Sequence, residues 1–430
     1  MSGSASRAAA ARVINAVLHR GRSLKGELKR ALPQLDDVRD RALVEAIAFA
    51  ALRNHARYAA ALDAWTPKPL GRRDDELRAL LYVGLAQIDS LKLPSHAAVD
   101  ATVEAARELK RAHQSGLVNA LLRRALREGV PQTDAAAAWP AWLLNRLRTD
   151  WPADVDAIVV HSAQAAPTWL RVNPAKGSRD AYLERLRHAG VAAVAHAALP
   201  DALRIDGSIA IASLPGFTDG AASVQDGAAQ AVADALDLPA GARVLDGCAA
   251  PGGKSAHLLE RDPVVRLTAT DIDAKRLRKV RETFARLGIG AEAAFHAADA
   301  TDPSPWWDGT PFDAVLIDAP CSATGIVRRQ PDILLHRRES DLPALVALQA
   351  RLLDALWPLV KPGGVLVYAT CSILQDENAR QVDTFLARTD NASAEGLDER
   401  FGRASGAGRQ RLPGEDGMDG FFYARLRKRS

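Results

Sequence analysis

The sequence predicts a multidomain protein with an all-α N-terminal domain, a small α/β insert and a doubly wound α/β C-terminal domain. In residues 4–129, apolar residues recur at helical spacing and β-branched runs are nearly absent. Residues 168–205 alternate short strand patterns with one helical pattern. From residue 222 onward, strand and helix patterns alternate repeatedly, which implies a mostly parallel sheet with helices on both faces.

We expect the domains to span residues 1–135, 142–221 and 222–430, with a Pro- and Ala-rich linker at 130–141 and a helix pair at 142–165. Residues 1–135 contain 22 Lys and Arg against 15 Asp and Glu, whereas the whole chain carries a net charge of only +4. A basic N-terminal third is typical of a nucleic-acid contact surface. Solvated helix faces would show the same excess, so charge leaves both interpretations open.

Composition excludes several classes of protein. An apolar share of 48% is enough for packed cores, yet we find no apolar run expected to span a bilayer and no apolar signal-peptide core. Three cysteines in 430 residues make no disulfide framework, and no CxxC pair indicates zinc. We therefore expect a cytoplasmic protein with no metal site and no membrane contact.

The C-terminal domain should form its sheet from five strands in succession, followed by a late sixth. The expected strands cover residues 242–246, 265–271, 292–296, 312–317 and 364–369. In a doubly wound sheet the fourth strand lies beside the first and the fifth beside the fourth. A last strand at 421–426 follows a glycine-rich loop, which predicts an antiparallel addition near one edge.

A glycine-rich turn between Asp246 and Lys254 separates the first of these strands from a helix, as in many cofactor sites. A nucleotide P-loop would require glycine where Cys248 stands, and Pro251 lacks the amide that such a loop uses to bind phosphate. The dinucleotide pattern GxGxxG is also absent. S-adenosylmethionine fits better, because it needs a tight turn and carboxylates. Asp271 is placed for the ribose hydroxyls and Asp299 for the adenine amino group, whereas Asp273 is expected to cap a helix.

Two cysteines follow the fourth and fifth expected strands. Cys321 ends the run that starts at Asp318, and Cys371 follows Thr370. Because neighbouring strands lie about 4.8 Å apart, the two thiols should converge beside the cofactor crevice. A thiolate that adds to carbon 6 of a pyrimidine makes carbon 5 nucleophilic enough to accept a methyl group. Asp318 would stabilise the adduct at ring nitrogen 3, and the second thiol would assist release. Cys248 is better explained as a small residue that fills space.

These motifs resemble the RNA 5-methylcytosine methyltransferases of the Nop/Sun family, and the resemblance covers nearly the whole chain. It implies that Cys371 is the nucleophile, that Cys321 assists product release and that Asp318 contacts the cytosine. The remaining implied contacts to S-adenosylmethionine come from the glycine-rich turn and from strand-end carboxylates: Cys248, Ala249, Ala250, Pro251, Gly252, Gly253, Lys254, Asp271, Asp299 and Asp318. Lys254 is assigned to the catalytic site as well. Gly247 departs from the family, where leucine is usual, as does Asp376, where glutamate is usual.

The helical N-terminus is similar to the NusB RNA-binding fold, and the C-terminal domain is then of Rossmann-like type. This pairing implies small-subunit (16S) rRNA as the partner, either free or in an early small-subunit particle. We expect a monomer. Two alternatives stay open: the same chemistry on tRNA or large-subunit rRNA, and a non-catalytic RNA-binding assembly factor. Further candidate RNA contacts are Arg171 and Asn173 in the insert and these basic residues of the C-terminal domain: Arg328, Arg329, Arg337, Arg338, Arg403, Arg409, Arg411, Arg425, Arg427, Lys428 and Arg429.

Overall fold

The computed structural model describes residues 3–205, 207 and 209–430, and the chain divides into two compact units. The first unit combines residues 1–165 with the separate segment 327–337, and the second holds residues 166–326 and 338–430. The segment 327–337 therefore packs with the N-terminal helices, although it lies within the C-terminal part of the sequence.

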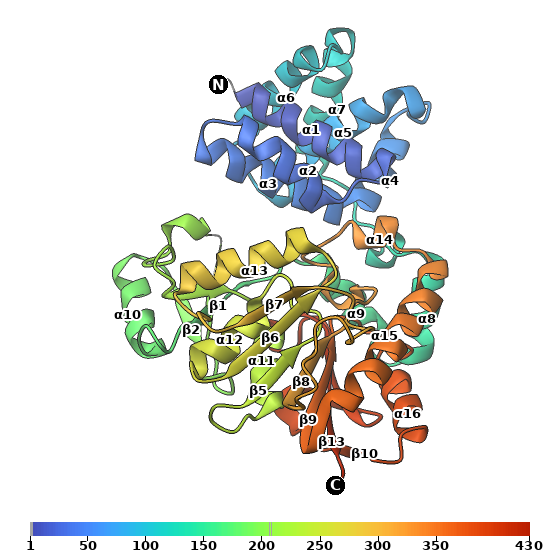
Figure 1. The fold of residues 1–430 in the computed structure, drawn as a ribbon. Helices are drawn as coiled ribbons and strands as arrows, with labels where there is room; N and C mark the ends of the chain where they lie inside the picture. Colours follow the sequence, from blue (N-terminus) through green and yellow to red (C-terminus); the bar gives the residue numbers. More distant parts are fainter. Residues whose placement is uncertain (1–2, 206, 208) are drawn as a thin grey trace. The chain divides into compact units, whose positions relative to one another are not determined.

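The first unit is helical, as the sequence predicts (Figure 1). Helix α1 packs against α3, α5 and α6, and small residues such as Ala8 and Ala11 are fully buried where these helices meet. The helices of this unit are α1 (Gly3–Arg20), α2 (Leu24–Ala31), α3 (Val38–Arg53), α4 (His55–Trp65), α5 (Asp75–Leu85), α6 (Ser95–Glu108), α7 (Ser115–Glu128), α8 (Ala141–Asp150), α9 (Val155–Ala163) and α14 (Ile333–His336). The all-α prediction is confirmed.

The second unit begins with a small antiparallel sheet in the order β2-β3-β1-β4. Its elements are β1 (Thr168–Val172), α10 (Arg179–His188), β2 (Ala193–Ala195), β3 (Ala202–Ile205) and β4 (Ala222–Val224). Leu170 and Val172 on β1 pack against Leu186 of α10, which gives this insert a core of its own. The predicted α/β insert is confirmed.

A mixed sheet of nine strands forms the rest of this unit, in the order β11-β12-β13-β9-β8-β5-β6-β7 with β10 paired to β13. Strands β5 to β9 run parallel, and β13 joins β9 in the antiparallel direction. The strands are β5 (Arg243–Asp246), β6 (Arg266–Asp271), β7 (Ala294–Ala297), β8 (Phe312–Asp318), β9 (Val360–Thr370), β10 (Ala392–Glu395), β11 (Arg403–Ser405), β12 (Gly408–Arg411) and β13 (Phe421–Lys428). The predicted strand order and the antiparallel addition are both confirmed.

Helices cover both faces of this sheet, because successive side chains of a buried strand point to opposite faces (Figure 1). Leu316 and Val367 share one apolar cluster with α11, α12 and α13, whereas Ile317 and Leu366 share another with α15 and α16. These helices are α11 (Gly227–Leu236), α12 (Gly253–Arg261), α13 (Ala274–Leu287), α15 (Leu342–Leu356) and α16 (Ala379–Ala387).

One helical stretch, residues Glu339–Leu359, is long and apolar enough by composition to cross a membrane. The expectation that no run reaches this length was therefore wrong. Leu352, Leu353 and Leu356 in this stretch are buried against β8 and β9, as in the core helix of a folded domain. Its apolar character is accounted for by packing on the sheet.

Arg171 and Asn173 are fully buried, so their prediction as RNA contacts was wrong. Arg171 binds Glu260 of α12 in a double ion pair, with Nε–Oε2 and Nη2–Oε1 distances of 2.6 and 2.9 Å. Its Nη1 also donates to the carbonyl of Gly253, 2.5 Å away. Asn173 donates to the carbonyl of Gly220. Arg171 thus joins the insert to α12, and Asn173 ties the end of β1 to the turn before β4 within the insert, where strand polarity alone suggested an exposed surface.

We expect Glu260→Ala to lower the free energy of unfolding by about 3–5 kcal/mol, because it leaves the Arg171 guanidinium buried and unpaired. Urea titration of the full chain measures this change. The matched control is Glu184→Ala, whose partner Arg187 lies on the surface, and its cost should stay below about 1 kcal/mol. Equal stability of the two variants would contradict the structural role of the Arg171–Glu260 pair.

Candidate active site

The glycine-rich turn leads from β5 into α12 and packs tightly against its neighbours. The Ala249 amide donates to the carbonyl of Thr270 at the end of β6, 2.8 Å away. Gly252 has a φ of +96°, and a Cβ built on it would lie 2.8 Å from Val280 Cγ1. Because a left-handed backbone and so close an approach both favour glycine, the turn brings its backbone to the sheet edge without a side chain in between.

Asp246 anchors this turn from inside the protein. Its carboxylate accepts hydrogen bonds from the Ser255 hydroxyl and from the Cys248 amide. The side chain is only 1% exposed, and burial raises the pKa of Asp246 to about 6. Asp246 therefore supports the turn and does not face the cavity. A Cβ on the neighbouring Gly247 would lie 2.6 Å from Leu356 Cδ1, so a larger side chain at this position would require Leu356 to shift.

A cavity of about 310 Å³ opens at the carboxyl ends of the parallel strands. Its lining includes seven of the predicted site residues: Cys248, Ala250, Asp271, Asp299, Asp318, Cys321 and Cys371. The other turn residues, Ala249, Pro251, Gly252, Gly253 and Lys254, are not among its lining residues. The structure thus brings the sequence-predicted carboxylates and thiols to one place, at the position where open α/β sheets bind ligands.

Two carboxylates follow β6 and β7 at this cavity. Asp271 is 4% exposed and accepts hydrogen bonds from the amides of Ala250 and Asp273 at 3.2 and 3.0 Å. Asp299 is exposed and accepts from the amide and hydroxyl of Thr301, both at 2.8 Å. Asp273 caps α13 as predicted, because its side chain accepts from two amides of the first turn.

The thiols of Cys321 and Cys371 lie 3.5 Å apart. The parallel pairing of β8 with β9 sets this proximity, because Asp318 lies opposite Ala369 and each cysteine follows within three residues. The hydrogen bond to Cys371, together with burial, raises the pKa of the Cys321 thiol well above its usual value. Cys321 therefore keeps its proton at neutral pH and can donate it toward Cys371.

Lys254 forms an ion pair with Asp318, with 2.6 Å between Nζ and Oδ2, and lies 5.1 Å from the centre of the Phe421 ring. Burial alone would lower the pKa of Lys254, but the charge of Asp318, its hydrogen bond to Lys254 and further negative charge nearby, including Asp246, together outweigh burial and raise it. Because the ammonium group stays charged, it holds the Asp318 carboxylate at the rim of the cavity, beside the two thiols.

Sequence reasoning missed one residue of this site, Glu377. Its carboxylate is fully buried and accepts hydrogen bonds from Ser322 and Ser372, the residues that follow the two cysteines. The signal that could have found it is the run Asp376-Glu377-Asn378 shortly after Cys371, where the family that the sequence resembles also carries acidic residues.

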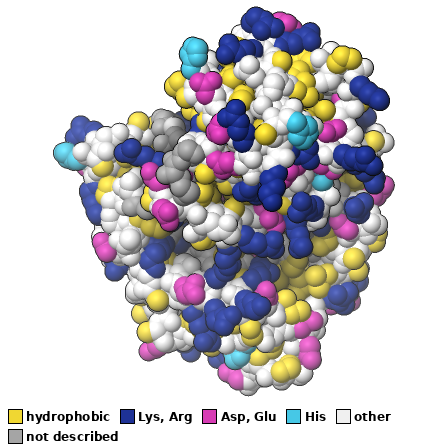
Figure 2. Space-filling model, turned by 90° about the horizontal axis from the view of Figure 1, so that it is seen from above, with side chains coloured by type: hydrophobic (Ala, Val, Ile, Leu, Met, Phe, Trp, Pro, Cys, Tyr) yellow, Lys and Arg dark blue, Asp and Glu magenta, His cyan; other side chains and the backbone are white. Residues whose placement is uncertain are grey.

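Several arginines predicted to contact RNA are instead held by the protein. Arg411 is 5% exposed and pairs with Asp416, and Arg425 pairs with Glu395. Arg328 is also buried. Exposed Lys and Arg side chains remain, and Figure 2 shows several groups of them on one face of the molecule. Among the described residues, no group of three or more His, Cys, Asp and Glu side chains is arranged to bind a metal ion.

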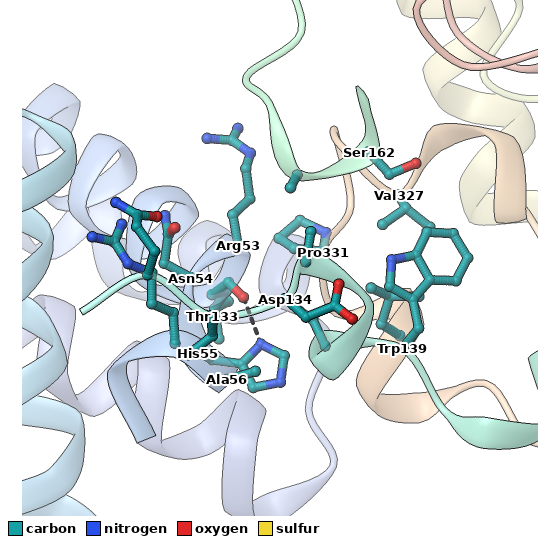
Figure 3. A pocket seen from close by; sticks show the side chains of 17 residues that line it. Arg53, Asn54, His55, Ala56, Thr133, Asp134, Trp139, Ser162, Val327 and Pro331 are labelled. Atoms are coloured by element: carbon teal, nitrogen blue, oxygen red, sulfur yellow. Dashed lines mark hydrogen bonds between the residues drawn. The ribbon is translucent and has the colours of Figure 1, made fainter. Parts of the chain in front are cut away.

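A second cavity, of about 160 Å³, lies within the helical unit (Figure 3). Arg53, Asp134 and Trp139 border it, and His55 Nδ1 lies 2.8 Å from the carbonyl of Leu52. It contains none of the predicted catalytic or cofactor residues, whereas the predicted thiols and carboxylates line the cavity at the sheet edge.

Three family models match the chain along its length. Residues 4–127 match the NusB family, residues 139–212 match the RsmF/B-like ferredoxin-like domain, and residues 233–427 match the 16S rRNA methyltransferase RsmB/F model. With these matches, the fold and the site define the class of protein: a Rossmann-like methyltransferase with a NusB-like domain and a ferredoxin-like insert.

Full-length relatives narrow this class. The chain is 57% identical to ribosomal RNA small subunit methyltransferase B of Xanthomonas campestris pv. campestris, over 100% of this chain and 98% of the relative. It is 45% identical to the protein of the same name from Pseudomonas putida, over 98% of each. The chain belongs to the ribosomal RNA small subunit methyltransferase B family.

Solved structures show the same fold. The crystal structure of PH0851 covers 100% of this chain and 99% of its own, with a TM-score of 0.79 at 23% identity. A methyltransferase homolog protein from Pyrococcus horikoshii matches 67% of this chain and 99% of its own, with a TM-score of 0.56 at 26% identity. The three-part architecture predicted from the sequence is therefore confirmed.

Proposed function

We propose that the chain transfers a methyl group from S-adenosylmethionine to carbon 5 of a cytosine in 16S rRNA, through a covalent cysteine–base intermediate. The observation that carries the proposal is the pair of thiols 3.5 Å apart, which line the same cavity as Asp271, Asp299 and Asp318. The names of the full-length relatives supply the substrate class.

The cavity suits S-adenosylmethionine in size and in chemistry. A volume of about 310 Å³ lies in the range of small-molecule sites. We assign Asp271 to the ribose hydroxyls and Asp299 to the adenine amino group, and the turn Cys248–Lys254 to the amino-acid end. The cofactor supplies an electrophilic methyl group when bound, and needs no phosphate-binding amides from the Pro251 turn.

We assign unequal roles to the two thiols, as the family resemblance implies. In the proposed reaction, Cys371 forms a bond to carbon 6 of the cytosine, and carbon 5 then takes the methyl group. Asp318, held by Lys254, faces ring nitrogen 3 and stabilises the adduct. Loss of the carbon-5 proton lets the carbon–sulfur bond break, which frees Cys371 and the methylated base. Cys321, whose thiol lies 3.5 Å from that of Cys371, assists this last step. The target base must leave its stack to reach the site.

We also propose a division of roles along the chain. Residues 1–135 and 142–221 would position the RNA, and residues 222–430 would perform the chemistry in a monomer. The net charge of residues 1–135, with 22 basic against 15 acidic side chains, supports phosphate contacts that orient the substrate without reading its sequence.

Bisulfite sequencing of cellular RNA tests the substrate. In cells with the gene, one cytosine of 16S rRNA should resist conversion, and the same position should convert fully when the gene is deleted. Complementation with the unmodified gene should restore resistance, and a Cys371→Ala gene should not. A gene-dependent position in tRNA or large-subunit rRNA would contradict the proposed substrate, and no such position anywhere would favour a non-catalytic factor.

A further inference from the structure

Glu377 is a buried acid with an unusual set of partners. It is fully buried, and no basic side chain of the described residues lies within ion-pair distance of it. Its carboxylate accepts hydrogen bonds from the Ser322 amide at 2.8 Å, from the Ser322 hydroxyl and from the Ser372 hydroxyl at 2.5 Å. The side-chain amide of Gln349 donates a fourth, at 3.1 Å. Four donors thus satisfy a charge that would otherwise be costly to bury.

The two serines that Glu377 binds follow the two cysteines directly in sequence. Backbone pairing between β8 and β9 reaches Asp318 and Ala369, and the chain then leaves the sheet in two separate loops. Beyond that point, Glu377 Oε2 accepts from the hydroxyls of both loops, which lie 3.1 Å from one another. One carboxyl group therefore bridges both loops past the end of the sheet, beside a backbone hydrogen bond from the Gly325 amide to the Cys371 carbonyl.

Glu377 is itself held in place from several directions. Its backbone carbonyl accepts from the Tyr368 hydroxyl of β9, 2.7 Å away. The next residue, Asn378, donates to the carbonyl of Ser372 at 2.9 Å and accepts from Thr370. Gln349, which donates to Glu377, also donates to the carbonyl of Pro320 beside Cys321. Because every partner is fixed by packing or by a further hydrogen bond, the carboxylate can define the position of both loops.

We infer that Glu377 is a positioning residue that holds the loops of Cys321 and Cys371 together, so that the two thiols stay within reach of the same base. Its consequence for turnover rests on the proposed function, whereas its consequence for the geometry of the thiols does not. The two consequences can be measured separately.

Phenylarsine oxide measures the geometry without any reaction on RNA. It condenses with two adjacent thiols, forming two arsenic–sulfur bonds and releasing one water. The test uses the full-length protein with Cys248→Ala, which leaves only this pair of thiols. In that background, Glu377→Ala should raise the apparent dissociation constant of phenylarsine oxide by about tenfold or more. Glu377→Gln should stay close to the unmodified protein, because its oxygen still accepts from the Ser322 amide and its nitrogen can donate to both hydroxyls.

Methyl transfer measures the second consequence, in the protein with its natural Cys248. Glu377→Ala should lower kcat by roughly 10²-fold, as expected when reacting groups shift by about 1 Å, with KM for RNA changed little. Glu377→Gln should restore most of kcat. The unmodified protein could show no methyl transfer while Glu377→Ala still binds phenylarsine oxide more weakly. In that case the proposed function fails and the positioning role stands.

Two further variants control for a general loss of structure. Phe385→Leu loosens the packing of the buried Phe385 ring against Trp357, and should bind the arsenical normally. If Glu377→Ala does not fold, Ser372→Ala serves in its place. It removes one of the hydroxyl groups that donate to Glu377 Oε2, and it should lower the affinity for phenylarsine oxide severalfold. Normal arsenical binding by folded Glu377→Ala, or by Ser372→Ala in its place, would overturn the inference, as would an equal loss in Phe385→Leu.

Discussion

Replacing Cys371 by alanine should abolish methyl transfer, with a loss of roughly 10⁴-fold or more, as expected when a covalent nucleophile is removed. No cysteine–RNA adduct should form, because the thiol assigned to attack carbon 6 is missing. A radiolabelled methyl-transfer assay on 16S rRNA measures the first effect, and denaturing gel electrophoresis of protein with RNA measures the second.

The control for this variant is cofactor binding, since Cys371 contributes only one wall of the cavity. Isothermal titration with S-adenosylmethionine should give nearly the same affinity for Cys371→Ala as for the unmodified protein. Substantial methyl transfer by the alanine variant would show that Cys371 is not the nucleophile.

Replacing Cys321 by alanine should have the opposite effect on the adduct. Cys371 can still attack and the methyl group can still transfer, but the group that assists release is missing. The protein should therefore accumulate a covalent complex with RNA that survives denaturation and carries the labelled methyl group, while multiple turnover stops. The measurement is the fraction of protein shifted on a denaturing gel after incubation with RNA and labelled cofactor. An adduct with Cys371→Ala and none with Cys321→Ala would reverse the two roles.

The sequence was sufficient to predict the fold and the meeting of the thiols. Strand order in a doubly wound sheet follows a general rule, so the ends of β8 and β9 had to be neighbours although 50 residues separate Cys321 from Cys371. Motif residues such as Asp271 and Asp299 also follow strand ends, and strand ends can be located from apolar patterns. Residues whose positions depend on such rules could therefore be placed from the sequence alone.

Partners that are distant in sequence could not be predicted in the same way. The pattern around Arg171 is that of an exposed strand, and only the position of Glu260, 89 residues later, makes the arginine a buried residue. Glu377 presents the same difficulty, because its role depends on Ser322 in another loop. An ionisable residue is equally compatible with solvent and with a distant partner, and no periodicity distinguishes the two.

The membership of residues 327–337 in the helical unit limits how the chain can be taken apart. In this segment Val327 and Leu334 are buried, and Asp332 accepts a hydrogen bond from the amide of Leu24 at the start of α2. A fragment that begins at residue 166 would keep this segment, which starts six residues after Cys321, but lose the helices that form its unit. The helical domain is therefore no detachable module. Genetic exchange of the helical domain within this family would have to replace two separate stretches of sequence at once.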